Sequence, residues 1–544
     1  MPDVWWKSGI IYQIYPRSFS DSNGDGIGDL SGIIGKLDYL NDGTTVSLGV
    51  DAIWLSPVYP SPQVDFGYDV ADYCAIDPLF GDLTIFSELV QQAHERGIRI
   101  IMDLVLNHTS DQHPWFIESR STLTNPRRDW YIWRSAHKGG PPNNWGSYFG
   151  GSAWRWDEHT GQYYLAMFTP EQPDLNWRNP AVRKALLAVV RFWLDLGVDG
   201  FRLDVFNQYY KDAEFRSNPR TFNPLGLVYR FWGQQHVYDR DQPEMYQALT
   251  QLRQLVDSYP ERMLVGETSD QGNFMKAIDY YGHNNDGLHL AFSFDFLHSR
   301  WRPGDFRRAI RKWEDNLPQW AWPTYVLSNH DVSRHFSRYG RGRWAQARAK
   351  IAATLLLTLR GTPTLYYGEE LGQADIRLSR KQILDPPGRR FWPIYKGRDG
   401  CRAPMQWDRS PRAGFTTGDP WLPVNSDYML KNIAMADTDP DSLLNFYRRL
   451  IWLRKQTPAL HSGRLALIDD DHRHLLAYQR FDDSTEILII LNFSQRWQQL
   501  ALTVESRLEV LLGSHWQASE CFTAGTIDLR PHEIIIAKKL VEGE

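Results

Sequence analysis

The sequence predicts an α/β protein whose centre is a closed barrel of eight parallel strands. Two observations support this fold class. Short apolar runs typical of strands recur eight times along the chain, and amphipathic stretches with helical periodicity separate several of them. Strand and helix in alternation imply parallel strands with crossover helices, and eight such units imply a (β/α)8 TIM barrel. A doubly wound open sheet gives the same alternation and remains the alternative on pattern alone.

The eight apolar runs lie near Ile11, Trp54, Met102, Arg202, Val265, Phe294, Leu327 and Tyr366. Two of the intervening helices are clear in the sequence, from Phe86 to Gly97 and from Ala181 to Gly197. Their apolar residues recur at spacings of three and four, and each stretch ends at a glycine, which is a common helix stop signal.

Two segments interrupt the alternation. Residues 107–175 are rich in Trp, Tyr, Gly and Pro and lack helical periodicity, which predicts an inserted subdomain after the third strand. Residues 372–429 form a second irregular insertion, after the eighth strand. Both would project from the carboxyl-terminal rim of the barrel, where such proteins place their active sites. The catalytic barrel then comprises residues 1–106 and 176–462.

The pattern changes again near residue 463. From there to residue 544 the apolar residues alternate with polar ones over several short runs, which predicts a C-terminal antiparallel β domain, expected to be a β-sandwich.

Composition limits the partners of the chain. Its 544 residues carry a formal net charge of -5, so no general electrostatic attraction to nucleic acid is expected and a neutral small substrate is favoured. The 23 tryptophans suit stacking against sugar rings, although most aromatic residues fill cores. Three scattered cysteines, no leader pattern and no apolar run of membrane-spanning length predict a cytoplasmic protein with no membrane contact. A monomer or homodimer is expected.

Polar side chains stand at the ends of three predicted strands. Arg202 and Asp204 end one strand two positions apart, so they point to the same side of it. Glu267 ends the next strand, and His330 and Asp331 end a third. Carboxylates brought together in this way repel, which raises the pKa of one and lets it act as an acid beside an ionised nucleophile. Each motif alone also fits an ordinary loop residue.

Eight motifs, in order from near residue 5 to about residue 420, resemble one family: QIYPRSF, DSNGDGIGD, DFGYDVADY, DLVLNH, GFRLD, GE, SNHD and CRAPMQWD. They are similar to the α-glucosidase and oligo-1,6-glucosidase branch of the α-amylase superfamily, glycoside hydrolase family 13, with the closest likeness to bacterial α-glucosidases. The resemblance implies a retaining mechanism in which Asp204 attacks the anomeric carbon. Glu267 is then the general acid/base, and Asp331 supports the charged transition state.

The resemblance also implies the residues that bind the sugar: Asp65, Tyr68, His108, Phe149, Phe168, Arg202, His330 and Arg402. Asp65 and Tyr68 correspond to residues that bind and stack on the terminal glucose, and Arg402 to an arginine that pairs with that aspartate. Together they are expected to close the non-reducing end of the pocket and impose exo action.

The loop DSNGDGIGD offers a set of oxygen ligands. Relatives with this loop bind Ca2+ or Mg2+ there, so a structural ion, Ca2+ in the first place, is expected on Asp21, Asn23, Asp25, the Ile27 carbonyl and Asp29. A solvated acidic turn without an ion is the alternative.

Val205 follows the nucleophile, and in this branch valine there accompanies activity on α-1,6 linkages, with α-1,4 linkages, trehalose and sucrose as further substrates. Transglucosylases and glucoside isomerases use the same intermediate, so they are one alternative. The other is a non-catalytic ancillary subunit of a transporter, which the full set of carboxylates argues against.

Overall fold

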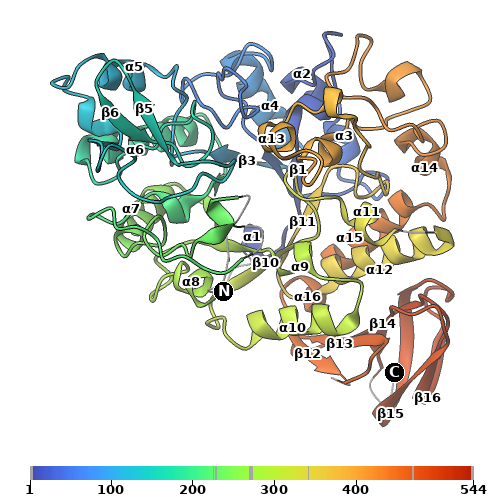
Figure 1. Ribbon diagram of the computed structural model, residues 1–544. Helices are drawn as coiled ribbons and strands as arrows, with labels where there is room; N and C mark the ends of the chain where they lie inside the picture. Colours follow the sequence, from blue (N-terminus) through green and yellow to red (C-terminus); the bar gives the residue numbers. More distant parts are fainter. Residues whose placement is uncertain are drawn as a thin grey trace.

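The computed structural model describes residues 4–223, 226, 229–268, 274–340, 342–468 and 471–540. Eight parallel strands close into a barrel at the centre of the molecule (Figure 1), which confirms the predicted fold class. The strands are β1 (Ile11–Ile14), β2 (Ala52–Leu55), β3 (Arg99–Leu104), β7 (Gly200–Leu203), β8 (Met263–Gly266), β9 (Leu290–Ser293), β10 (Trp322–Val326) and β11 (Thr362–Tyr366). They neighbour one another in the order β1-β11-β10-β9-β8-β7-β3-β2. The doubly wound alternative is therefore excluded.

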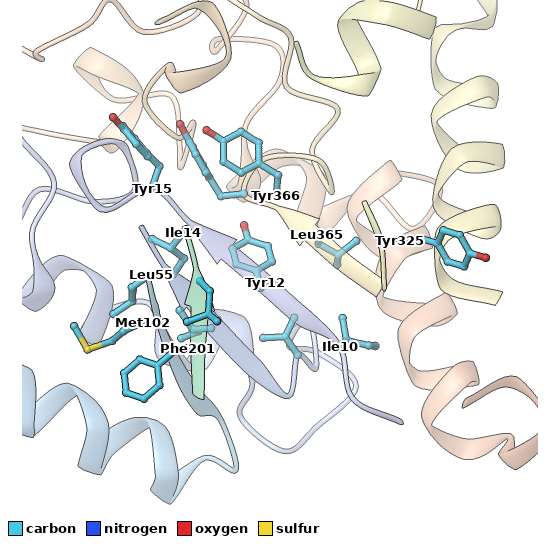
Figure 2. Packing of buried hydrophobic residues seen from close by; sticks show 14 of the residues in the cluster. Ile10, Tyr12, Ile14, Tyr15, Leu55, Met102, Phe201, Tyr325, Leu365 and Tyr366 are labelled. Atoms are coloured by element: carbon cyan, nitrogen blue, oxygen red, sulfur yellow. The ribbon is translucent and has the colours of Figure 1, made fainter. Parts of the chain in front are cut away.

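The barrel strands are buried on both faces, as parallel strands covered by helices must be. Alternate residues separate into two apolar clusters: Ile11, Trp54 and Val265 belong to the cluster inside the barrel. Their neighbours along the strands, such as Tyr12, pack outward against the helices. Figure 2 shows this outer packing around β1, with Tyr12 close to Leu365 of β11.

Helices surround the barrel, and three of the longest, α4 (Leu83–Glu95), α6 (Pro180–Asp195) and α15 (Leu443–Gln456), begin at side-chain caps. The other long helices are α7 (Glu244–Asp257), α10 (Pro303–Glu314) and α12 (Ala345–Thr358). The Asp82 carboxylate accepts hydrogen bonds from the first amides of α4, and Asn179 caps α6 ahead of Pro180. Within the described ranges, no helix has the length and apolar character needed to cross a membrane.

Two insertions project from the barrel. The first follows β3 and contains α5 (Pro114–Ser121) and a three-stranded sheet of β4 (Trp133–Arg134), β6 (Gln162–Leu165) and β5 (Trp154–Asp157). The short helix and the sheet were not evident from periodicity, because each element spans only two to eight residues. The second insertion follows β11 and contains α13 (Pro386–Phe391) and the 3-10 turns η8 (Asp399–Arg402) and η9 (Pro411–Gly414).

The C-terminal domain is antiparallel, as predicted. Its strands are β12 (Arg464–Ile468), β13 (Leu475–Phe481), β14 (Glu486–Asn492), β15 (Gln498–Gly513), β16 (Cys521–Leu529) and β17 (Ile534–Lys539). The prediction of a sandwich differs in one respect, because all six strands belong to a single hydrogen-bonded sheet. The register of β15 shifts against both of its neighbours, and a sheet irregular in this way can bend over its own apolar face.

Candidate active site

Arg202 is the centre of a buried charge cluster at the mouth of the barrel. Its Nη1 donates to Oδ1 of Asp103 at 2.7 Å and to Oδ1 of Asp204 at 2.6 Å. Its Nη2 donates to Oε2 of Glu267 at 2.7 Å. The side chains of Arg202 and Asp204 therefore lie on the same side of the strand end, as their spacing predicts. One guanidinium holds three carboxylates from three neighbouring strands, β3, β7 and β8.

Three carboxylates and one arginine leave an excess of negative charge in this cluster. Burial raises the pKa of Asp204 well above its usual range, Arg202 opposes this, and the charges of Glu267 and Asp103 raise the pKa further. Burial also raises the pKa of Asp103 against the effect of Arg202. Close carboxylates oppose one another's ionisation, and Arg202 is the cation that holds Asp204 and Glu267 side by side.

Val205 has a backbone conformation that β-branched residues rarely adopt. Its φ of 34° and ψ of 37° fall in the left-handed region. This turn directs the Val205 amide toward Glu267, where it donates to Oε2 at 3.1 Å. The residue after the predicted nucleophile therefore helps to hold the predicted acid.

His330 and Asp331 lie beside this cluster. Tyr68 Oη lies 2.6 Å from His330 Nε2 and donates to Oδ2 of Asp103 at 2.9 Å, and its ring stacks on the imidazole. His330 Nε2 is also 3.0 Å from Oδ2 of Asp331, while Nδ1 contacts Gln13. Burial alone would raise the pKa of Asp331, but His330 and two arginines outweigh it and hold that pKa well below its usual range. Asp331 is therefore an ionised carboxylate, 28% exposed.

The ion pair of Asp65 corrects one detail of the sequence prediction. Arg398, and not Arg402, donates to Oδ1 of Asp65, at 2.6 Å. Arg402 is committed elsewhere, because its Nε donates to the His330 carbonyl at 2.8 Å and its Nη2 to Oδ1 of Asp331 at 3.1 Å. Arg398 also contacts Asp331 at 3.1 Å. The predicted pairing of Arg402 with Asp65 is wrong, although both arginines belong to the cluster.

His108 and the two predicted aromatic residues form the wall next to Asp65. His108 Nε2 lies 3.2 Å from the Tyr68 carbonyl, and burial lowers the pKa of His108 to about 4, so it is neutral at neutral pH. Gln172 Nε2 bridges His108 and Oδ2 of Asp65. The rings of Phe149 and Phe168 contact each other, Phe168 contacts His108, and Arg398 lies over Phe149.

Four residues of the cluster were missed by the sequence analysis: Gln13, Asp103, Gln172 and Arg398. Asp103 carried a signal, because a charged residue within an otherwise apolar strand needs a partner. Arg398 lies four residues before Arg402, just ahead of the motif CRAPMQWD, and spacing alone does not say which of the two arginines reaches Asp65. Gln13 carried a signal similar to that of Asp103, because it begins the motif QIYPRSF and is the polar residue of a buried apolar strand, whereas Gln172 has no distinguishing pattern.

The predicted ion-binding loop lies against residues 415–421. Asp21 Oδ1 accepts from the amides of Asn23 and Gly24, and its Oδ2 accepts from Gly26 and from the Thr416 hydroxyl. A side chain at Gly26 would collide with the Asp419 carbonyl, which fixes the loop closely on this segment. Within the described ranges, no three His, Cys, Asp or Glu side chains are grouped to hold a metal. The oxygen set suits a hard cation only together with the Asn23 amide and the Ile27 carbonyl.

Comparison with known families identifies the family to which this fold and charge cluster belong. Residues 13–463 match the alpha-amylase family, described as "Alpha amylase, catalytic domain". The chain therefore belongs to the α-amylase family and is a glycoside hydrolase.

Proteins similar to this chain include α-glucosidases and oligo-1,6-glucosidases. A probable alpha-glucosidase of Rhizobium meliloti is 44% identical over 518 residues, which cover 94% of this chain and 93% of the relative. An oligo-1,6-glucosidase of Parageobacillus thermoglucosidasius is 40% identical and covers 99% of each chain. Among solved structures, the trehalulose synthase MutB of Pseudomonas mesoacidophila superposes with a TM-score of 0.89 at 37% identity, over 99% of this chain and 100% of that one.

Proposed function

We propose that this protein is a retaining, exo-acting α-glucosidase that releases α-glucose from the non-reducing end of short α-glucosides. The observation that carries the proposal is the bridge of Arg202 between Asp204 and Glu267. Neighbouring nitrogens of one guanidinium hold the two carboxylates, which keeps them close together. A retaining glycosidase needs them about 5–5.5 Å apart, too close for a water molecule to attack from between them.

The bonds of this bridge also assign the reacting oxygens. Arg202 binds Oδ1 of Asp204, which leaves Oδ2 to attack the anomeric carbon. Both Arg202 and the Val205 amide donate to Oε2 of Glu267, so that oxygen cannot carry the proton, and Oε1 delivers it to the leaving group. The same Oε1 then takes a proton from the water that hydrolyses the glucosyl-enzyme.

Exo action follows from the closed end of the pocket. Asp65, Arg398 and Asp331 form a continuous chain of ion pairs there, with Gln172 bonded to Asp65. These charged groups suit the hydroxyls of a terminal sugar, and we propose that they close that side of the pocket to a longer chain. Long α-glucans would therefore be attacked only from their ends.

Replacement of Glu267 by Gln tests the acid role. The variant should lose about 10²–10⁴-fold in kcat on disaccharides, whose leaving groups need a proton, and much less in the glucosylation step with an activated aryl α-glucoside. Burst kinetics with the aryl substrate would show accumulated glucosyl-enzyme. Equal losses on both substrate types would remove Glu267 as the acid.

We also propose which glycosidic linkage the enzyme prefers. Val205 favours α-1,6 bonds, and one relative is an oligo-1,6-glucosidase, which supports isomaltose-type substrates. A second candidate function is glucoside isomerisation or transglucosylation. Similarity to MutB and to the alpha-glucosyl transfer enzyme XgtA supports this candidate. XgtA is 40% identical and superposes with a TM-score of 0.91, over 99% of this chain and 100% of that one. Product analysis at high sugar concentration separates transfer from hydrolysis.

We further propose a structural Ca2+ or Mg2+ on the loop of residues 21–29, a cytoplasmic location, and a monomer or homodimer. All three cysteines, Cys74, Cys401 and Cys521, are unpaired, which supports a reducing compartment. Sedimentation of the purified protein would give the subunit number.

A further inference from the structure

A second cavity shares a wall with the catalytic pocket. It is an open pocket of about 740 Å3 between the inserted subdomain and α13, and Phe149 and Phe168 line it. The same two rings contact Arg398 and His108 of the catalytic pocket, whereas none of the carboxylates Asp65, Asp204, Glu267 and Asp331 lines the second cavity. The two spaces therefore lie next to each other but are chemically distinct.

The charge of this cavity is opposite to that of the catalytic pocket. Arg155, Arg389 and Arg390 line it, with Glu171 as the only acid among the lining residues. Arg389 is partly committed, because its Nε donates to the Ile383 carbonyl at 2.7 Å. The Arg155 Nε is buried and has no hydrogen-bond partner in the described part of the chain. The cavity thus holds a surplus of positive charge in a chain whose net charge is -5.

Arg390 lies close enough to Arg155 for the two charges to interact. It packs on a glycine turn of the inserted subdomain, where a side chain on Gly150 would lie 2.7 Å from Arg390 Nε and one on Gly151 would lie 3.0 Å from its Nη2. Burial lowers the pKa of Arg155, Tyr164 and Glu171 oppose this, and the nearby charge of Arg390 adds to the lowering. Glu171 supplies one negative charge against three arginines, so the lining keeps a surplus of positive charge that a bound anion would offset.

We propose that this cavity binds a small organic phosphate of about the size of a phosphorylated monosaccharide, with Arg155 and Arg390 as the phosphate ligands. Planar guanidinium groups match phosphate oxygens in pairs. The aromatic walls supply apolar faces for a ring, and a volume of about 740 Å3 is more than inorganic phosphate needs. The bound anion would tie the inserted subdomain to α13 beside Phe149, next to the closed end of the catalytic pocket.

Calorimetric titration of the full-length enzyme with glucose 6-phosphate, inorganic phosphate and glucose, at constant ionic strength, tests the site. Glucose 6-phosphate should bind more tightly than either of the others, and Arg155→Gln or Arg390→Gln should each weaken it at least tenfold. Arg380→Gln is the matched control, because Arg380 is an exposed arginine of the same insertion that does not line the cavity. Basal glucosidase activity of each variant checks its fold.

Three results would overturn the proposal. Unchanged affinity in both Arg155→Gln and Arg390→Gln would remove these residues as ligands. If inorganic phosphate binds as tightly as glucose 6-phosphate, the site does not recognise the sugar. If glucose binds as tightly as glucose 6-phosphate, the site does not recognise the phosphate. The readout is binding, so it does not depend on the proposed α-glucosidase activity.

Discussion

The carboxylates at the barrel mouth and those of the loop at residues 21–29 have partners of opposite kinds. At the mouth, Asp204 and Glu267 are held by a guanidinium, and Asp65 and Asp331 by arginines from a distant insertion. In the loop, Asp21 accepts mainly from backbone amides two to five residues further along. The carboxylates at the mouth are brought together only when the barrel is assembled, whereas those of the loop stabilise a local turn.

This difference predicts that changes at the mouth alter the rate and leave the fold intact, and that changes in the loop do the reverse. The largest effect is expected for Asp204→Asn. The amide keeps an oxygen for Arg202 but is no nucleophile, so kcat should fall by roughly 10⁴-fold or more. Melting temperatures of the two proteins should agree closely. Near-normal turnover would remove Asp204 as the nucleophile.

Arg398→Gln should have the next largest effect. It leaves the buried Asp65 without its ion-pair partner, and loss of one member of such a pair costs about 2–5 kcal/mol, so kcat/KM should fall by at least about 30-fold. Arg402→Gln is the comparison, because it keeps the pair of Asp65 with Arg398 and removes instead a donor to Asp331. A larger rise in KM for Arg402→Gln than for Arg398→Gln would reverse the pairing that the structure gives.

A smaller effect is expected from His108 on acid stability. Its pKa is lowered to about 4 in the folded protein, against an ordinary value near 6.5, so the unfolded chain binds the proton first as the pH falls. Stability should therefore decrease from about pH 6.5 to about pH 4, by up to ~1.4 kcal/mol per pH unit from this group. Urea unfolding of His108→Gln across this range should give a shallower slope. Parallel slopes would contradict the assignment.

The smallest effect on catalysis is expected from the loop. If the loop binds Ca2+ or Mg2+, chelation should lower the melting temperature by several degrees with little loss of rate at low temperature, because a structural ion stabilises only the folded state. Asp25→Asn should reproduce the effect, since Asp25 belongs to the predicted ligand set. An immediate loss of turnover with no thermal shift would make the ion catalytic instead.

Much of the fold could be predicted because each barrel strand is a short apolar run with its own turn signals. The catalytic carboxylates were also evident, since polar residues at the ends of Gly200–Leu203 and Met263–Gly266 stand out against buried strands. The small sheet of the inserted subdomain was not, because two- to four-residue strands have no readable period.

The partners of the predicted residues were harder to derive. Arg402 belongs to the motif CRAPMQWD and Arg398 lies just before it, and the turn of η8 places Arg398 against Asp65. The partner of Gln172 was equally hard to derive, because its contact with His108 joins positions 64 residues apart in the chain. Spacing predicts which residues share an edge of the barrel, but long side chains select their partners through packing.

The most direct test of the central claim is the anomer of the first glucose released, followed by proton NMR with isomaltose, maltose, trehalose, sucrose and a long α-glucan as substrates. The bridged pair of Asp204 and Glu267 predicts α-glucose as the initial product from the short sugars, and Val205 predicts that isomaltose is cleaved fastest. Initial β-glucose would contradict the retaining mechanism and with it the assignment of Asp204 as the nucleophile.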